Sequence, residues 1–239
     1  MREAKNSSHR NPGPEEGSRD RTVIVQKYIE KPLLVYKRKF DIRAFGMLTC
    51  VGGKLRGYFY EEGYLRTSSK EFNLKALGNK YVHLTNDAIQ QTATDFGKFE
   101  SGNKLSFSDF QKYLKVTEDL KDAYKDDNGR VNFYKQILPQ IRHLVAESFR
   151  AVAYKKIDPE RKHCSFEIFG FDFMIDEDFA VYLIEVNTNP CLETNSAILS
   201  RIIPVLLDAS FRIAVDPVLP PPELNFKRAH EALHENKYI

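Results

Sequence analysis

The order of apolar and polar positions along the chain predicts a set of strands. A β-branched run over residues 23–32 (VIVQKYIEKP) predicts a first strand that stops at a proline. Two strand-like runs flank residues 51–54 (VGGK), where the paired glycines favour a β-hairpin. The later runs CSFEIFGFDFMID and FAVYLIEVN predict two more strands. These runs together indicate an antiparallel sheet.

Helical periodicity predicts the elements that pack on this sheet. Apolar residues recur at helical spacing from Phe133 onward, and Pro139 inside this pattern predicts a kink or a late helix start. The run that begins at Ser106 has the signature of a helix start. Residues 196–215 are amphipathic, with Pro204 as a second candidate for a kink. The fold class is therefore expected to be α+β, with antiparallel strands packed by helices.

The two ends of the chain differ from its middle. Residues 1–22 are polar and charged and contain proline and glycine, which predicts disorder. Residues 223–239 are expected to form a charged tail, so the ordered domain is predicted to span 23–222. Residues 61–105 alternate loop signals with short apolar pieces and receive no assignment. Residues 121–130 are expected to be a solvated loop.

Composition and charge narrow the class of protein. Of the 239 residues, 42% are hydrophobic and 29% charged, and no apolar run approaches the roughly 18 residues of a membrane span. The net charge of +3 is too small to indicate nucleic acid as a partner. Cys50, Cys164 and Cys191 have no CxxC spacing and suggest neither a zinc site nor a disulfide framework, so a reducing, cytoplasmic location is expected. No glycine-rich phosphate-loop motif is present.

A carboxylate and an amide lie two positions apart near the end of the last predicted strand. Alternation places Leu183, Glu185 and Asn187 on one face. If residues 177–178 form a two-residue loop, Asp172 lies opposite Leu183 and diagonal to Glu185 on that face. A loop one residue longer would move Asp172 to the other face.

Three oxygen ligands that converge from rigid strands suit Mg²⁺, which prefers carboxylate and carbonyl oxygens together with substrate phosphates. The alternative is that Asp172, Glu185 and Asn187 are ordinary polar residues on a solvated sheet face. Apolar neighbours share that face, so buried carboxylates there would need partners.

Basic and polar residues cluster in three other short motifs. In KFDIR, alternation places Lys39, Asp41 and Arg43 on one strand face, where they could form a structural ion pair or bind phosphates. Arg66 in GYLRTSS carries little information alone, because exposed loop arginines are common. The HLTN motif at 83–86 has three hydrogen-bonding side chains, and a turn or helix cap is the alternative to a binding role.

Six of these motifs, in order, resemble the tubulin–tyrosine ligase family, which includes polyglutamylases and polyglycylases. They are VQKYIEKPLL, KFDIR, EEGYLRTSS, HLTN, FEIFGFDFMID and LIEVNTNP. The resemblance runs from about residue 23 to residue 222. It implies an ATP-grasp fold, of which this chain would hold mainly the C-terminal subdomain.

The resemblance also implies an activity and a set of residue roles. The expected reaction joins an amino acid to a tubulin tail through an acyl-phosphate, with ATP and Mg²⁺. The adenine would be bound by Gln26, Lys27, Tyr28 and Ile29, and the rest of the nucleotide by Lys39, Asp41, Thr85 and Asn86. Arg43 would face the phosphates or the acyl-phosphate, and Arg66 the amino-acid or acceptor carboxylate. Asp172, Glu185 and Asn187 would be the magnesium ligands.

The family pattern and this sequence differ upstream. Relatives carry another nucleotide-binding lysine and a glycine-rich loop there, and GPEEGSRDR does not match that loop. A catalytic part of a larger ligase is therefore expected, and the alternative is a non-catalytic fragment that binds nucleotide or tubulin. The expected partners are tubulin tails or microtubules and a free amino acid, with a location at the cytoskeleton, including cilia or flagella. Glutamate, tyrosine and glycine remain open, and Lys104 is either a surface lysine or a partner for glutamate's second carboxylate.

Overall fold

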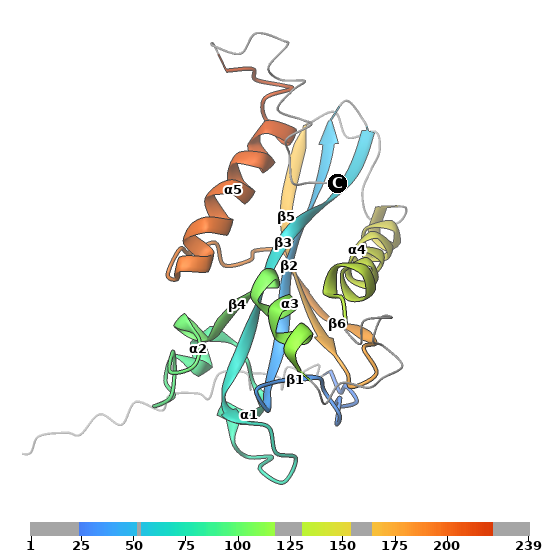
Figure 1. The fold of residues 1–239 in the computed structure, drawn as a ribbon. Helices are drawn as coiled ribbons and strands as arrows, with labels where there is room; N and C mark the ends of the chain where they lie inside the picture. Colours follow the sequence, from blue (N-terminus) through green and yellow to red (C-terminus); the bar gives the residue numbers. More distant parts are fainter. Residues whose placement is uncertain (1–23, 52–53, 118–130, 154–163, 222–239) are drawn as a thin grey trace, which may run out of the picture.

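The computed structural model describes residues 24–51, 54–117, 131–153 and 164–221, and they form a mixed structure of helices and antiparallel sheet (Figure 1). The sheet has six strands in the order β4-β3-β2-β5-β6, and β1 pairs with β2 off this path. The strands are β1 (Leu34–Val35), β2 (Arg38–Val51), β3 (Lys54–Glu71), β4 (Lys104–Ser106), β5 (Ser165–Ile175) and β6 (Val181–Asn187). The helices are α1 (Lys80–His83), α2 (Asp87–Gln90), α3 (Phe107–Val116), α4 (Leu138–Ala153) and α5 (Ala197–Ala214), with short turns at Ser101–Asn103 and Phe133–Ile137. The α+β class and its antiparallel strands are confirmed.

The long β2–β3 hairpin forms the centre of the sheet. Val51 pairs with Lys54, which confirms the hairpin predicted from VGGK. β3 continues to Glu71, so the first part of the segment that receives no assignment from the sequence, residues 61–71, is strand. The register shifts between Ala44 and Phe45, where β3 carries the additional residues Glu61 and Glu62. β2 and β3 have 14 and 18 residues, so each strand carries both apolar core residues and the charged residues of the motifs KFDIR and GYLRTSS.

Helices cover both faces of the sheet (Figure 1). On one face, Phe40, Ile42 and Ala44 pack in a core with residues of α3 and α4. On the other face, Phe45 and Met47 pack against α5. Strand alternation explains this division, because successive side chains of β2 point to opposite faces.

The helix predictions are largely confirmed, and their caps explain why. The Ser106 side chain accepts a hydrogen bond from the Asp109 amide at 3.1 Å, so α3 begins as its sequence predicts. A π-turn over Phe133–Ile137 precedes α4, which confirms a late start for the regular helix around Pro139. Proline is tolerated there, because amide groups in the first helical turn have no acceptor within the helix. α5 continues through Pro204.

The predicted first strand is wrong. Residues 24–31 form no strand, and within the described ranges no neighbouring strand pairs with them. β propensity without a partner does not make a strand, because the ladder provides the backbone hydrogen bonds. The segment is held at its end, where the Leu33 amide donates to the Ile175 carbonyl oxygen at 2.8 Å, and in its middle by the Tyr28 side chain, whose hydroxyl lies 2.8 Å from His83 Nδ1. The predicted disordered start, the loop at 121–130 and the tail at 223–239 lie outside the described residues.

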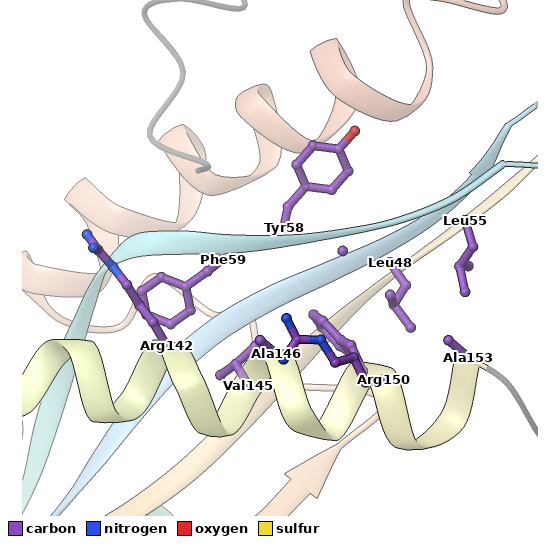
Figure 2. Close-up of a pocket in the computed structure, with 11 residues that line it drawn as sticks. Leu48, Leu55, Tyr58, Phe59, Arg142, Val145, Ala146, Arg150 and Ala153 are labelled. Carbon is purple, nitrogen blue, oxygen red and sulfur yellow. The ribbon is translucent and has the colours of Figure 1, made fainter.

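A separate apolar hollow lies between the hairpin and α4 (Figure 2). It has a volume of about 390 Å³ and is lined mainly by apolar side chains of both elements. None of the charged residues that the sequence singled out lines it. Among the described helices, none has both the length and the apolar character that crossing a bilayer requires.

Candidate active site

The β5–β6 hairpin differs from its predicted register. The Asp176 amide donates to the Ala180 carbonyl oxygen at 3.1 Å, and Phe179 has a positive φ of 56°, so the loop is longer than two residues. The Asp176 carboxylate accepts hydrogen bonds from the amides of Asp178 and Ala180, at 2.9 and 3.0 Å. An Asx-type turn of this kind stabilises the longer loop, and the sequence prediction did not include it.

A register shift in β6 restores the predicted cluster. Phe173 pairs with Leu183, but the residue before it, Asp172, pairs directly with Glu185, so Ile184 is an additional residue in β6. The prediction that Asp172 lies opposite Leu183 and diagonal to Glu185 is therefore wrong. Leu183 packs against the α3–α4 core, on the face away from Asp172. The longer loop alone would separate Asp172 from Glu185, and the bulge brings them together.

The three predicted metal ligands lie close together at the end of this hairpin. The Asn187 side-chain nitrogen lies 3.4 Å from an Asp172 carboxylate oxygen and 3.2 Å from a Glu185 carboxylate oxygen. Asp172 is 2% exposed, whereas Glu185 is exposed and Asn187 is half-buried. The alternative of a solvated sheet face is wrong for Asp172 and holds only for the outer edge of the cluster.

Arg43 forms a bidentate ion pair with Asp172 from the neighbouring strand. Its Nε and Nη2 donate to the two carboxylate oxygens at 2.5 and 3.0 Å. The two residues are direct cross-strand partners between β2 and β5. Gly170 leaves room for this guanidinium, because a Cβ there would lie 3.3 Å from Arg43 Nη1 and 2.9 Å from the Pro190 Cβ. The glycine in β5 thus leaves space for Arg43 in the position where Asp172 holds it.

Arg66 joins two carboxylates on the same face. It pairs bidentately with Asp41, its cross-strand partner, and its Nη2 lies 2.9 Å from an Asp172 oxygen. Burial alone would lower the pKa of Arg66, but the charges and hydrogen bonds of Asp41 and Asp172 raise it above its usual value. Arg66 is a buried strand residue and not an exposed loop arginine, the common case that makes it uninformative from the sequence alone.

The charge state of Asp172 follows from these partners. Burial raises the pKa of its carboxyl group, but hydrogen bonds from Arg43 and the charges of Arg66 and Arg43 outweigh that effect. The net result is a pKa below the usual value of an aspartic acid. Asp172 is therefore a carboxylate at neutral pH, which is the form that a cation requires.

Lys39 lies on the same strand face as Asp41 and Arg43, as alternation predicts. Its ammonium group donates to the His83 carbonyl oxygen at 2.7 Å and to the Tyr28 hydroxyl at 3.3 Å. It also lies 4.8 Å from the centre of the Tyr28 ring, and that hydroxyl is 2.8 Å from His83 Nδ1. Burial lowers the pKa of Lys39, and the nearby charge of Asp41 opposes this effect. Asp41 pairs with Arg66, so the structural ion pair considered within KFDIR is not its main contact.

The remaining predicted nucleotide contacts are only partly brought to this face. Tyr28 contacts Lys39, whereas Gln26 and Lys27 are exposed and make no side-chain hydrogen bond within the described part of the chain. Ile29 is half-buried. In HLTN, Thr85 is buried, and Asn86 is exposed and directly precedes α2. Asn86 occupies the N-cap position of α2, but its side chain makes no capping hydrogen bond. The helix-cap interpretation of HLTN therefore holds for backbone position only.

Lys104 and Asp87 extend the charged row to the edge strand. Lys104 is the cross-strand partner of Arg66 in the β3–β4 pair. It is 3% exposed, and its ammonium group lies 2.9 Å from Asp87 and 3.2 Å from the Gly102 carbonyl oxygen. The surface-lysine interpretation is therefore wrong. Sequence reasoning missed Asp87, although its position just after HLTN was a usable signal.

The residues present fit a magnesium ion bound with phosphates. Mg²⁺ is usually held by one or two carboxylates, with substrate oxygens and water completing its shell. Asp172 and Glu185 would supply two carboxylates, although that of Asp172 already pairs with Arg43 and Arg66. Asn187 would supply an amide oxygen when its side chain turns over. Within the described ranges, no group of three or more His, Cys, Asp and Glu residues gathers as a metal site. A metal site whose remaining ligands are substrate oxygens and water is consistent both with the two carboxylates of Asp172 and Glu185 and with the absence of a larger cluster in the described ranges.

The fold and the site define a protein in which one face of an antiparallel sheet carries paired arginines, a lysine and a carboxylate–amide cluster. The sequence profile of the tubulin-tyrosine ligase family matches residues 11–223. The chain therefore belongs to the tubulin–tyrosine ligase family.

Individual relatives support this membership. Tubulin glycylase 3B of Tetrahymena thermophila is 34% identical over 193 residues, covering 81% of this chain and 15% of the relative. Tubulin glycylase 3B of Drosophila melanogaster is 35% identical over 206 residues, covering 83% and 25%. The probable tubulin polyglutamylase TTLL9 of Mus musculus is 32% identical over 173 residues, covering 72% and 34%. The chain thus spans about a third or less of the length of these relatives.

Proposed function

We propose that this chain is the C-terminal catalytic part of an ATP- and Mg²⁺-dependent ligase of the ATP-grasp type that adds an amino acid to tubulin tails. The observation that carries the proposal is the row of charges in which Arg43 and Arg66 meet Asp172 beside Glu185 and Asn187. Names of relatives support tubulin as the acceptor, because they include tubulin glycylases and a probable tubulin polyglutamylase. Association with the cytoskeleton, including cilia or flagella, follows from that acceptor.

The proposed chemistry brings anions together, and the cations of this face oppose their repulsion. An acceptor carboxylate oxygen attacks the γ-phosphorus of ATP, ADP leaves, and an acyl-phosphate forms. The amino group of the incoming amino acid then attacks the acyl carbon, phosphate leaves, and an amide bond results. Lys39 and Arg43 would hold phosphate oxygens, and Arg66 would orient a carboxylate. Mg²⁺ held by Asp172, Glu185 and Asn187 would neutralise phosphate charge.

Positioning rather than proton transfer would supply much of the rate. No general base is required of this face if the amine is held close to the acyl carbon. The residues best placed for that role are strand residues, because β2, β3 and β5 hold Arg43, Arg66 and Asp172 by cross-strand pairing. The rigid sheet would keep the reacting groups aligned through both steps.

The amino acid is proposed to be glycine or glutamate, with tyrosine as the third candidate. Glycylases and a probable polyglutamylase both occur among the relatives. Lys104 was the candidate partner for a second carboxylate, but Asp87 already neutralises it. This pairing weakens the argument for glutamate that rested on Lys104.

A parallel ligation assay tests the proposed function. Full-length protein with Mg²⁺ and ATP is given labelled glycine, glutamate or tyrosine and a tubulin-tail peptide, and peptide mass and ADP release are measured. One amino acid should be incorporated with ADP in equal amount. No incorporation of any of the three would contradict the ligase assignment.

Calorimetry with the 239-residue chain separates the ligase from a fragment that only binds. Micromolar, Mg²⁺-dependent ATP binding by this chain would show that its own residues form the nucleotide site. Binding without any ligation by the full-length protein would favour the non-catalytic alternative.

A further inference from the structure

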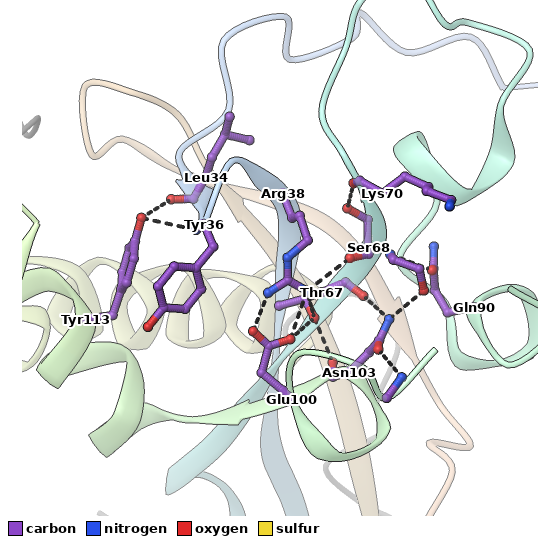
Figure 3. A network of polar contacts seen from close by, with 12 residues as sticks. Leu34, Tyr36, Arg38, Thr67, Ser68, Lys70, Gln90, Glu100, Asn103 and Tyr113 are labelled. Carbon is purple, nitrogen blue, oxygen red and sulfur yellow. Dashed lines mark hydrogen bonds and ion pairs between the residues drawn. The ribbon is translucent and has the colours of Figure 1, made fainter. Parts of the chain in front are cut away.

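A second buried charge cluster lies beside the candidate site. Arg38, 1% exposed, pairs bidentately with Glu100, and the Nη1–Oε2 distance is 2.9 Å (Figure 3). Arg38 Nη1 also donates to the Thr67 hydroxyl and the Ser68 carbonyl oxygen, each at 3.2 Å. Thr67 in turn donates to Glu100 at 2.9 Å. The cluster joins the start of β2 to the end of β3 through a residue of the following loop.

Asn103 extends this network to the start of β4. Its side-chain nitrogen donates to the Thr67 carbonyl oxygen at 3.0 Å and to the Ser69 hydroxyl at 2.9 Å. Its side-chain oxygen accepts from the Gly97 amide at 2.8 Å. Asn103 has a positive φ of 53°, an uncommon conformation that these bonds stabilise. The loop before β4 is therefore tied to β3 at several points (Figure 3).

Three members of the network are direct chain neighbours of three cations of the site. The pairs are Arg38 and Lys39, Thr67 and Arg66, and Asn103 and Lys104. Because adjacent residues of a strand point to opposite faces, Arg38 and Thr67 lie on the face away from Lys39 and Arg66. Asn103 precedes β4 and joins the same network through its bonds to Thr67 and Ser69. Contacts agree with this placement, since Arg38 bonds Glu100 whereas Lys39 bonds His83.

We propose that the Arg38–Glu100 network is a positioning device that sets the places of Lys39, Arg66 and Lys104 on the opposite face. The proposal rests on the proposed ligase function. Burying an ion pair gives little net stability compared with an apolar pair of similar volume. The bidentate pair does fix β2 relative to the loop before β4, because its geometry tolerates little displacement, and Thr67 joins β3 to both. The contribution of the Arg38–Glu100 pair to the protein is therefore to align Lys39, Arg66 and Lys104.

The test replaces both charges at once. The double variant Arg38→Met with Glu100→Leu keeps an apolar filling, so the thermal midpoint should stay close to that of the unaltered protein. Ligation by the full-length protein should nevertheless lose about 100-fold in kcat/KM, the scale expected for misplaced catalytic groups. Calorimetry should show weaker Mg²⁺–ATP binding, because Lys39 is displaced. If the network only stabilises the fold, a double variant with an unchanged thermal midpoint should also keep the Mg²⁺–ATP binding and the kcat/KM of the unaltered protein, and this result would contradict the proposal.

A second variant decides the matter if the double variant does not fold. Thr67→Val removes the hydroxyl that links Arg38, Glu100 and the loop while keeping the side-chain shape. We expect a smaller loss of kcat/KM and weaker Mg²⁺–ATP binding than in the unaltered protein. Wild-type values for both in a folded Thr67→Val protein would overturn the proposal.

The control removes an ion pair from the same loop but outside the network. Asp95 pairs with Lys70 of β3, and both side chains are partly exposed. Asp95→Asn should leave kcat/KM and nucleotide binding unchanged, and an equal loss there would also overturn the proposal. If the unaltered protein ligates no amino acid, the proposed function fails; if it ligates and the variants match it, only the positioning role fails.

Discussion

The face of the sheet that meets α5 has two halves with opposite chemistry. On β2, the side chains of this face change from Asp41 and Arg43 to Phe45 and Met47 within seven residues. The apolar half packs under α5, and the charged half meets Asp172 of β5. Both halves are buried, so burial alone does not distinguish them.

The difference between the halves separates folding from chemistry. Apolar burial stabilises the fold in proportion to the area removed from water. Paired charges contribute less net stability after desolvation, yet removing one partner leaves an uncompensated charge. Substitutions in the α5 half should therefore lower the free energy of unfolding, and those at the exposed edge of the charged half should lower activity alone.

Glu185→Gln should show the largest effect on activity. Glu185 is exposed, so the change should move the thermal midpoint little, while loss of a metal-binding carboxylate should lower the ligation rate at least about 100-fold. Initial rates with labelled amino acid and a melting curve measure both quantities in the full-length protein. Glu167→Gln, which changes an exposed carboxylate on the neighbouring strand β5, is the matched control and should retain full activity. Undiminished activity of Glu185→Gln would remove this residue from the metal site.

Leu206→Ala should show the opposite behaviour. Leu206 is fully buried under the sheet in α5, so the substitution should cost about 2–5 kcal/mol of unfolding free energy. Denaturant unfolding measures this loss, and the Mg²⁺–ATP dissociation constant of the folded protein should stay the same. Val205→Ala, one residue earlier and largely exposed, is the control with little effect on either quantity. A loss of ATP binding by folded Leu206→Ala protein would contradict the expectation that the apolar half contributes to stability alone.

The sequence predicted the strands and helices better than the geometry of the site. Period-two alternation placed Lys39, Asp41 and Arg43 together because β2 has no additional residue among them. The β5–β6 hairpin contains two irregularities of opposite effect, the longer loop closed by Asp176 and the bulge at Ile184. The cluster of Asp172 and Glu185 was therefore predicted through a wrong register.

Other site residues could not be predicted, because their environment depends on long-range contacts. Burial of Arg66 and Lys104 follows from β3 pairing with both β2 and β4, and nothing local in GYLRTSS or SGNKLSF indicates it. The first predicted strand failed for the same reason, since a strand requires a partner that sequence propensity does not reveal.

Gly170→Ala should weaken the charged half without removing a charge. A Cβ at this position would lie 2.9 Å from the Pro190 Cβ and 3.3 Å from Arg43 Nη1, so the arginine must move. We expect a loss of about 10-fold in kcat/KM, corresponding to about 1.4 kcal/mol of barrier. Gly78→Ala is the matched control, because nothing lies within 4 Å of the added carbon there. Equal rates for both variants would show that the position of Arg43 is not limiting.

Lys39 offers the smallest effect, and its two readouts should have opposite signs. Burial lowers its pKa, so as pH rises Lys39 loses its proton earlier than an ordinary lysine, and Mg²⁺–ATP binding should weaken. In the same range the unfolded chain holds more protons than the folded one, so the contribution of Lys39 to stability should rise with pH. Lys39→Arg remains charged there, and its binding, normalised to its own maximum, should not decline until higher pH. If Mg²⁺–ATP binding declines at the same alkaline pH in both proteins, another group causes the decline. If the decline moves to higher pH in Lys39→Arg, Lys39 is a buried cation that the folded protein retains for binding despite its cost to stability.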